Sequence, residues 1–216
     1  MDNKRAQRMT CKLCNATAFW FANAASRDYY RCDTCRSVML HPRFLLSPDE
    51  EKARYETHNN CPGDPRYQKF VSPIVDAVKE HFGKQAKGLD FGAGTGPVIT
   101  KMLTDAGYSM ALYDPFFHDN PNVLNQQYDF IACCEVIEHF HQPAKEFRLL
   151  RSLLKKGGVL YCKTELFSEN TDFEDWYYKN DPTHVFFYHE KSLAWICENL
   201  SFSYAHIDGR LIVLIT

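Results

Sequence analysis

The stretch GLDFGAGTGPV at residues 88–98 constrains the fold of this chain more than any other feature. Residues 88–91 have the pattern of a short buried strand, residues 97–106 that of a helix, and residues 109–113 that of a second strand. This order forms a βαβ unit, and open α/β sheets bind ligands beside the carboxyl ends of their parallel strands. The sequence therefore predicts an α/β fold with a ligand crevice at the glycine-rich residues 92–96.

The glycine spacing distinguishes between nucleotide cofactors. Gly92, Gly94 and Gly96 form GxGxG, whereas a dinucleotide fingerprint is GxGxxG, and Pro97 stands where its third glycine would be. Proline suits the first turn of a helix but does not give that fingerprint's close helix–strand packing. GxGxG after an apolar strand that contains Asp90 resembles motif I of the class I S-adenosylmethionine (SAM) methyltransferases.

The resemblance implies a set of SAM-binding residues. In that family an acid at the end of the second strand commonly holds both ribose hydroxyls, and Asp114 occupies this place. A carboxylate suits the task because its two oxygens accept two O–H donors side by side. The cofactor-binding residues implied are Asp90, Gly92, Ala93, Gly94, Gly96, Asp114, Pro115, Cys134 and Glu135.

The resemblance to the methyltransferases extends over residues 67–216. YDFIACCEVIEHF resembles motif IV, and the segments after it resemble a helix, a KGG turn, the fifth strand, a substrate-side loop and two last strands, of which the final one is antiparallel. Only fourteen residues separate Asp114 from Asp129, so we expect the third strand of the Rossmann-like sheet to be short or absent. Asp119 is a candidate for contacting adenine; a solvated turn aspartate is the other, favoured interpretation.

Four of the nine cysteines form two CxxC pairs, Cys11 with Cys14 and Cys32 with Cys35, seventeen residues apart. Four thiolates around Zn²⁺ make a closed, tetrahedral structural site, and the strand-like segments between the pairs suit a ribbon. Redox pairs or unrelated thiols are the alternative. The prediction is a zinc ribbon over residues 1–45, a linker over 46–66 with helix in PDEEKARYE, and a SAM-binding methyltransferase domain over 67–216.

The segment EVIEHFH at residues 135–141 has three interpretations. In a helix, Glu135, Glu138 and His139 would share one face, where they would bond the backbone, act as acid and base, or bind a metal. ExxEH followed by a distant histidine resembles the ubiquinone-pathway O-methyltransferases and the small-RNA 2′-O-methyltransferases. That likeness implies a divalent ion at Glu135, Glu138, His139 and His184. His141 is expected at the surface.

His184, in DPTHVFFY, is the strongest single candidate for a catalytic residue, with His139 and Glu135 as further candidates. It follows Trp176, Tyr177 and Tyr178, which are expected to wall an acceptor pocket. A histidine is an effective general base near neutral pH. The alternative is that His184 pins its loop to a nearby carboxylate.

Charge and hydropathy restrict the partners. The net charge of -2 gives no general attraction for nucleic acid, although Lys4, Arg5, Arg8 and Lys12 form a local basic cluster. No apolar run approaches the roughly 20 residues that span a bilayer, and the amino-terminal residues lack an apolar signal segment, so we expect a cytoplasmic protein. The sequence predicts a SAM-dependent methyltransferase with a small-molecule acceptor, its methylated atom and the oligomeric state undetermined. The alternatives are an RNA methyltransferase that grips its substrate with the ribbon, and a SAM-binding interaction module without catalysis.

Overall fold

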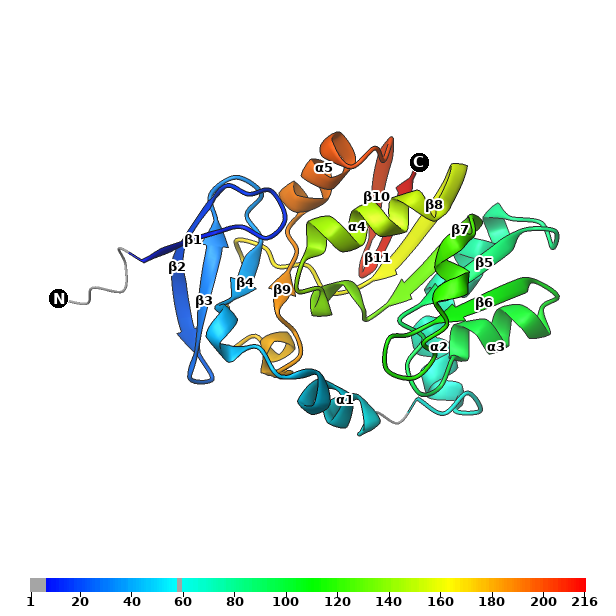
Figure 1. Cartoon of the computed structure of the whole chain (residues 1–216), viewed down its shortest axis with the longest axis horizontal. Helices are drawn as coiled ribbons and strands as arrows, with labels where there is room; N and C mark the ends of the chain where they lie inside the picture. The colour runs from blue at the N-terminus through cyan, green and yellow to red at the C-terminus, as the bar shows by residue number, and fades with distance from the viewer. Residues whose placement is uncertain (1–6, 58–59) are drawn as a thin grey trace.

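Two β-sheets organise residues 7–57 and 60–216, the part of the chain that the computed structural model describes (Figure 1). The larger sheet has the strand order β10-β11-β8-β7-β5-β6. Its strands are β5 Lys87–Phe91, β6 Ser109–Tyr113, β7 Tyr128–Cys134, β8 Leu154–Lys163, β10 Tyr204–Asp208 and β11 Leu211–Ile215. β5, β6, β7 and β8 pair in parallel, and β11 lies antiparallel between β8 and β10. The predicted α/β, Rossmann-like sheet with a final antiparallel strand is confirmed.

The third strand, predicted to be short or absent, does not occur among the described residues. β6 forms the edge of the larger sheet among the described residues. The chain beyond it makes an isolated bridge between Asp114 and His118 and a short 3-10 helix, η3 Pro121–Asn125, before it enters β7. Because the third strand would lie at the edge of the sheet, the central strands remain paired without it and the core stays intact.

Helices cover both faces of the larger sheet and bury a separate apolar cluster on each. On one face, α2 Pro65–His81 and α3 Val98–Asp105 pack on side chains such as Phe130 and Tyr161. On the other, α4 Pro143–Ser152 and α5 Glu190–Asn199 pack on Ile131 and Leu160. Neighbouring strand residues therefore point into different cores, as expected of a sheet that is buried on both sides.

Helix α2 begins at Pro65, two residues before the stretch that resembles the methyltransferases. Asp64 caps it by accepting a hydrogen bond from the backbone N–H of Arg66, and Pro65 suits the first turn because it lacks the N–H that the turn leaves unpaired. Pro73 lies inside the helix. The KGG segment differs from expectation: it lies within β8, where the pairing with β7 shifts register, and not in a turn before the strand.

The smaller sheet contains the cysteine-rich segment and one strand from the far end of the chain. Its order is β1-β2-β3-β4-β9, with β1 Arg8–Thr10, β2 Thr17–Ala24, β3 Arg27–Cys32, β4 Val38–Leu40 and β9 Phe186–Phe187. β9 follows the loop after β8, so the substrate-side loop completes the sheet of the amino-terminal module (Figure 1). The apolar core of this module is also continuous with the cluster beneath α4 and α5.

A short 3-10 helix, η2 Pro42–Phe44, and helix α1 Pro48–Glu56 connect the two sheets. The helix predicted in PDEEKARYE is confirmed, and a capping box explains its start: Ser47 and Glu50 bond each other's backbone N–H groups. The boundaries at residues 45 and 66 remain predictions. Of the predicted basic cluster, Lys4 and Arg5 lie outside the described residues. Among the described helices, none has the length and apolarity needed to cross a bilayer.

Candidate active site

A cavity of about 920 Å³ opens at the carboxyl ends of β5, β6 and β7. This volume is near the upper end of the range for ligand pockets, roughly 300–1,000 Å³, so the cavity has room for a nucleoside cofactor and a second small molecule. The structure brings every residue of the predicted cofactor set to its wall. These residues are Asp90, Gly92, Ala93, Gly94, Gly96, Asp114, Pro115, Cys134 and Glu135.

Asp114 ties the glycine loop to the turn after β6. One of its carboxylate oxygens accepts a hydrogen bond from the backbone N–H of Gly94 at 2.9 Å, and the other accepts from Phe116 and Phe117 at 2.8 and 3.1 Å. Each oxygen of a carboxylate has two acceptor sites, so these three bonds leave one site, on the oxygen that accepts from Gly94, for a hydroxyl donor of a ligand. Asp114 therefore shapes the cofactor loop and lies where ribose recognition was predicted.

Asp90, in β5 just before the glycine loop, bonds the start of the helix that follows the loop. Its carboxylate is buried and accepts hydrogen bonds from the hydroxyl of Thr100 at 2.9 Å and from its backbone N–H at 3.3 Å. These bonds hold the first turn of α3 against β5. Burial raises the pKa of Asp90 to about 6, although the bonds from Thr100 oppose the shift.

Gly96 is required by a close backbone contact that the sequence does not reveal. A Cβ atom at this position would lie 1.7 Å from the carbonyl oxygen of Asn60, so no side chain fits without moving one of the two segments. Gly92 and Gly94 have positive φ angles of 78° and 62°, which glycine adopts readily. Asn60, in the segment expected to be only a linker, thus helps to wall the cofactor crevice.

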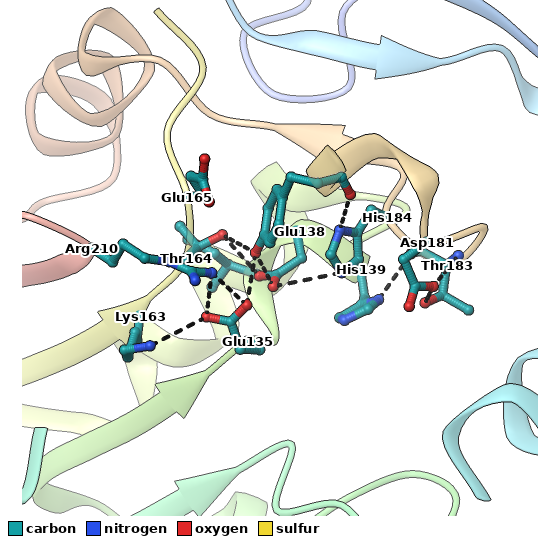
Figure 2. A network of polar contacts seen from close by, with 12 residues as sticks. Glu135, Glu138, His139, Lys163, Thr164, Glu165, Asp181, Thr183, His184 and Arg210 are labelled. Carbon is teal, nitrogen blue, oxygen red and sulfur yellow. Dashed lines mark hydrogen bonds and ion pairs between the residues drawn. The ribbon is translucent and has the colours of Figure 1, made fainter. Parts of the chain in front are cut away.

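Glu135 lies at the carboxyl end of β7 in a strained conformation. Its φ angle is 53°, which is uncommon for a residue with a side chain and recurs at functional sites. Arg210 donates to both of its carboxylate oxygens, at 2.8 and 2.7 Å, and the hydroxyl of Tyr178 lies 3.1 Å away (Figure 2). Burial and the charge of Glu138 raise the pKa of Glu135 to about 7.

The chain does not form an α-helix after Glu135, the condition under which Glu135, Glu138 and His139 would share a face. The positive φ angle leads into a 3-10 turn, η4 Ile137–His139, and this turn separates the two glutamates. Glu135 faces the cavity, whereas Glu138 is fully buried behind it. Glu138 accepts hydrogen bonds from the hydroxyls of Thr164, at 3.0 Å, and of Tyr178, and burial raises its pKa to about 7.

The two candidate histidines lie side by side, with ring centroids 4.9 Å apart. The Nδ1 atom of His139 lies 2.9 Å from the carbonyl oxygen of Thr183, and that of His184 lies 2.7 Å from the carbonyl oxygen of Tyr178. Because a carbonyl only accepts, both Nδ1 atoms carry a proton. In the neutral rings each Nε2 atom then keeps its lone pair, as a base or a metal ligand requires.

Glu138, His139 and His184 form a compact group of possible ligands. One ligand atom from each residue lies within 4.8 Å of the others, and the Nε2 atom of His184 is 4.0 Å from the carboxylate of Glu138 (Figure 2). Glu135, the fourth residue of the predicted set, instead pairs with Arg210. A carboxylate with two imidazoles suits borderline cations such as Zn²⁺, Mn²⁺ and Fe²⁺.

The wall opposite the glycine loop has parts that were predicted and parts that were not. Tyr177, Tyr178 and His184 line the cavity, whereas Trp176 is buried behind them and donates to Glu165 at 2.8 Å. Helix α1 contributes residues that the sequence did not indicate: Glu51, Arg54 and Tyr55. The sequence predicted the helix, but no signal in the sequence indicated that it lines the cavity.

The structure bears on two single-residue expectations. His141, expected at the surface, is half-buried and lines the cavity, because Glu51 of α1 lies 2.7 Å from its Nε2 atom. The candidate for adenine recognition, Asp119, is exposed and does not line the cavity. It therefore fits the other interpretation, a solvated turn residue.

The four cysteines of the CxxC pairs converge as predicted. Their Sγ atoms lie within 4.8 Å of one another, with 3.6 Å between Cys11 and Cys35 and 3.3 Å between Cys14 and Cys32. These separations are far longer than a disulfide bond of about 2.05 Å. Contacts with the Cys32 and Cys35 thiols, together with burial, raise the pKa of Cys11. A dication would remove this penalty on the thiolates, so the cluster fits Zn²⁺.

A family model described as a methyltransferase domain matches residues 64–207. The chain belongs to this methyltransferase family. Among curated proteins it is similar to the ubiquinone biosynthesis O-methyltransferase of Serratia proteamaculans, with 30% identity over 82 residues, and to that of Sodalis glossinidius, with 28% identity over 82 residues. The matched segments cover 38% of this chain and 34% and 33% of those enzymes, so the chain spans about a third of the relatives' length.

Solved methyltransferase structures share the fold. A SAM-dependent methyltransferase from Archaeoglobus fulgidus aligns with a TM-score of 0.54 and 16% identity over 69% of this chain and 94% of its own. The 1,6-didemethyltoxoflavin-N1-methyltransferase of Burkholderia thailandensis, solved with S-adenosylhomocysteine (SAH), aligns with a TM-score of 0.51 and 15% identity over 91% of this chain and 96% of its own. Together with the glycine loop and the strand order, these likenesses identify the fold as that of class I SAM-dependent methyltransferases.

Proposed function

We propose that this protein transfers a methyl group from SAM to a small-molecule acceptor. The observation that carries the proposal is the single cavity in which the glycine loop, Asp114 and Glu135 face a second wall made by α1 and residues 177–184. One wall has the groups that bind a nucleoside, and the other has aromatic and titratable groups that suit a polar organic molecule. The curated relatives are named for O-methyl transfer, which makes a hydroxyl the first acceptor atom to test.

Methyl transfer needs the lone pair of the acceptor in line with the sulfonium of SAM. In the proposed arrangement Asp114 and the glycine loop hold the cofactor, while Tyr55, Tyr177 and Tyr178 hold the acceptor against it. Orienting two reactants in this way can lower a barrier by roughly 7–11 kcal/mol. For a hydroxyl acceptor, the Nε2 atom of His184 or His139 takes the proton that leaves the oxygen.

Calorimetry with SAM and SAH tests the cofactor half of this proposal. Asp114→Ala removes the hydroxyl acceptor and loosens the glycine loop, so it should weaken SAM binding at least about tenfold, since bonds to charged groups are worth about 1.5–3 kcal/mol. Asp119→Ala, five residues away and outside the cavity, is the matched control and should bind as the unchanged protein does. A protein that binds neither SAM nor SAH would contradict the assignment.

Transfer itself is tested with SAM labelled in its methyl group. Incubation with pooled small metabolites should give labelled low-molecular-weight products, and His184→Ala should reduce the yield. Transfer of the label to RNA would support the RNA methyltransferase alternative. In that case the affinity of the protein for RNA should also fall steeply as the salt concentration rises. SAM binding without any labelled product would support a non-catalytic module.

Two metal sites are part of the proposal. The four cysteines would hold one structural Zn²⁺, which leaves no open position for chemistry. As the alternative to a histidine base, Glu138, His139 and His184 would hold a second divalent cation, whose role would be to bind acceptor oxygens and lower their pKa. Metal analysis should then give two equivalents in the protein loaded with Zn²⁺ and one in His139→Gln. A single equivalent in both, retained by the cysteines, would remove the second site. The cytoplasmic location remains a prediction.

A further inference from the structure

The loop that carries His184 is held by residues that precede the methyltransferase domain in the sequence. Residues 177–180 form a 3-10 turn, η5 Tyr177–Asn180, and the chain then passes His184 and enters β9. The family model covers residues 64–207. Two arginines that precede it, Arg27 and Arg54, converge on Asp181 within this loop.

Arg27, the first residue of β3, bonds the backbone of the loop. Its Nη2 atom donates to the carbonyl oxygen of Lys179 at 2.6 Å, and its Nη1 atom lies 3.5 Å from the carbonyl oxygen of Asp181. That same Asp181 oxygen accepts the backbone N–H of His184 at 3.2 Å. One carbonyl group therefore joins the arginine of the amino-terminal module to the backbone of His184.

Arg54 of α1 holds the side chain of the same aspartate. It donates to one carboxylate oxygen of Asp181 at 2.6 Å, and the other oxygen accepts from the N–H and hydroxyl of Thr183 at 3.0 and 2.6 Å. The carbonyl oxygen of Thr183 in turn accepts the Nδ1 proton of His139 (Figure 2). Both candidate histidines thus take their orientation from the backbone of residues 178–183.

The loop is also attached to the module at its other end. β9 pairs with β4 through Phe186 and Phe187, and the N–H of Leu40 donates to the carbonyl oxygen of Val185 at 2.9 Å. Residues 177–187 are therefore held at both ends by elements of the first 56 residues. Among these contacts, those of Arg27 are charge-assisted and reach the carbonyl groups directly, so they are stronger than neutral bonds.

We propose that Arg27 is a positioning residue: through the carbonyl groups of Lys179 and Asp181 it fixes the loop that presents His184 to the cavity. The cysteine-rich module then acts as a clamp on the acceptor wall. The consequence for catalysis rests on the proposed methyltransferase function, whereas the position of the loop does not. The test can therefore fail separately from the proposed function.

Hydrogen–deuterium exchange of the full-length, SAH-bound protein measures the clamp. Arg27→Ala should speed exchange in the 178–188 segment by at least about tenfold, because two backbone contacts to a charged donor are lost. Arg27→Lys keeps one donor and should give an intermediate rate. Exchange in the glycine loop, the affinity for SAH and the zinc content should stay unchanged.

Arg31→Ala is the matched control. It removes the same charge from the same strand, but its partner is the exposed Glu169, so exchange in 178–188 should not change. Unchanged exchange in this segment in Arg27→Ala, or equal acceleration in it and in the glycine loop, would overturn the proposal. Where an acceptor is in hand, Arg27→Ala should lower kcat with that acceptor while the KM for SAM stays constant, and Arg27→Lys should restore part of the loss.

Discussion

Asp90 has a carboxylate whose charge the fold disfavours. Its pKa in the folded protein is about 6, against an ordinary value of 3.8, because the side chain is buried beneath the glycine loop. Between these two values the folded protein binds a proton that the unfolded chain has released. The stabilising contribution of protonated Asp90 is therefore complete below about pH 4 and is lost as the pH rises through about 6.

Asp90→Asn should remove this pH dependence. Between pH 5 and pH 7.5 the free energy of unfolding of the unchanged protein should fall, relative to that of the variant, by about 1–2 kcal/mol. Urea unfolding of both proteins at the two pH values measures the difference, in which other titrating groups cancel. Asp119→Asn, at an exposed position, should follow the unchanged protein. A constant difference between the unchanged protein and Asp90→Asn would mean that Asp90 is ionised throughout.

The glycine loop is where a single added methyl group should disturb an element. Gly96→Ala places a Cβ atom against the carbonyl oxygen of Asn60, and a contact of 1.7 Å forces the loop or the 60–64 segment to move. Overpacking of this kind costs typically about 1–3 kcal/mol. We expect a lower melting temperature and SAH binding weakened at least tenfold, measured by calorimetry.

Gly157→Ala is the control for this substitution. Gly157 has a φ angle of 74°, but a Cβ atom there meets nothing within 4 Å. Its cost is the backbone strain alone, of order 1 kcal/mol, and it lies outside the cavity. SAH binding should therefore persist in Gly157→Ala. Equal loss of binding in both variants would show that Asn60 does not restrict the loop.

Sequence patterns predicted the elements whose residues repeat regularly or follow a known motif. The apolar strands, the glycine loop, the acid at residue 114 and the two CxxC pairs each have a local signature, and the structure places all of them as expected. The short interval between Asp114 and Asp129 predicted a short or absent third strand, because fourteen residues leave room only for a turn and one short element.

The features that were missed depend on contacts between distant segments. The left-handed backbone of Glu135 has no sequence signature, since glutamate rarely adopts it. Nothing in α1 indicates that its Glu51 meets His141, or that Arg54 meets Asp181. The two residues of β9 are too few to predict as a strand, and they pair only because the cysteine-rich module offers the edge of β4.

At the scale of the whole molecule, the two sheets are not independent. The cysteine cluster lies at one end of the smaller sheet, β9 brings the acceptor loop into that sheet, and the apolar core of the module runs into the cluster beneath α4 and α5. The glycine loop leads instead into α3, which packs with α2 on the opposite face of the larger sheet. Loss of the cysteine site should therefore disturb residues 177–184, the proposed acceptor wall, before it disturbs the glycine loop of the cofactor wall.

Cys14→Ser tests this order. Loss of one thiolate should release the proposed Zn²⁺, since a structural site needs all four ligands. The melting temperature should fall by roughly 5–15 °C, because each 1 kcal/mol shifts it by about 2–4 °C in a chain of this size. Trypsin should then cut the module and the 177–188 loop first, while calorimetry still detects SAH binding within about threefold of the original affinity, a factor worth less than 1 kcal/mol. Cys61→Ser, at an exposed cysteine outside the cluster, should change none of these properties. If Cys14→Ser keeps its zinc, the four cysteines do not form the proposed site. If it loses SAH binding as fast as the 177–188 loop becomes cleavable, the cysteine module does not act on the acceptor wall alone.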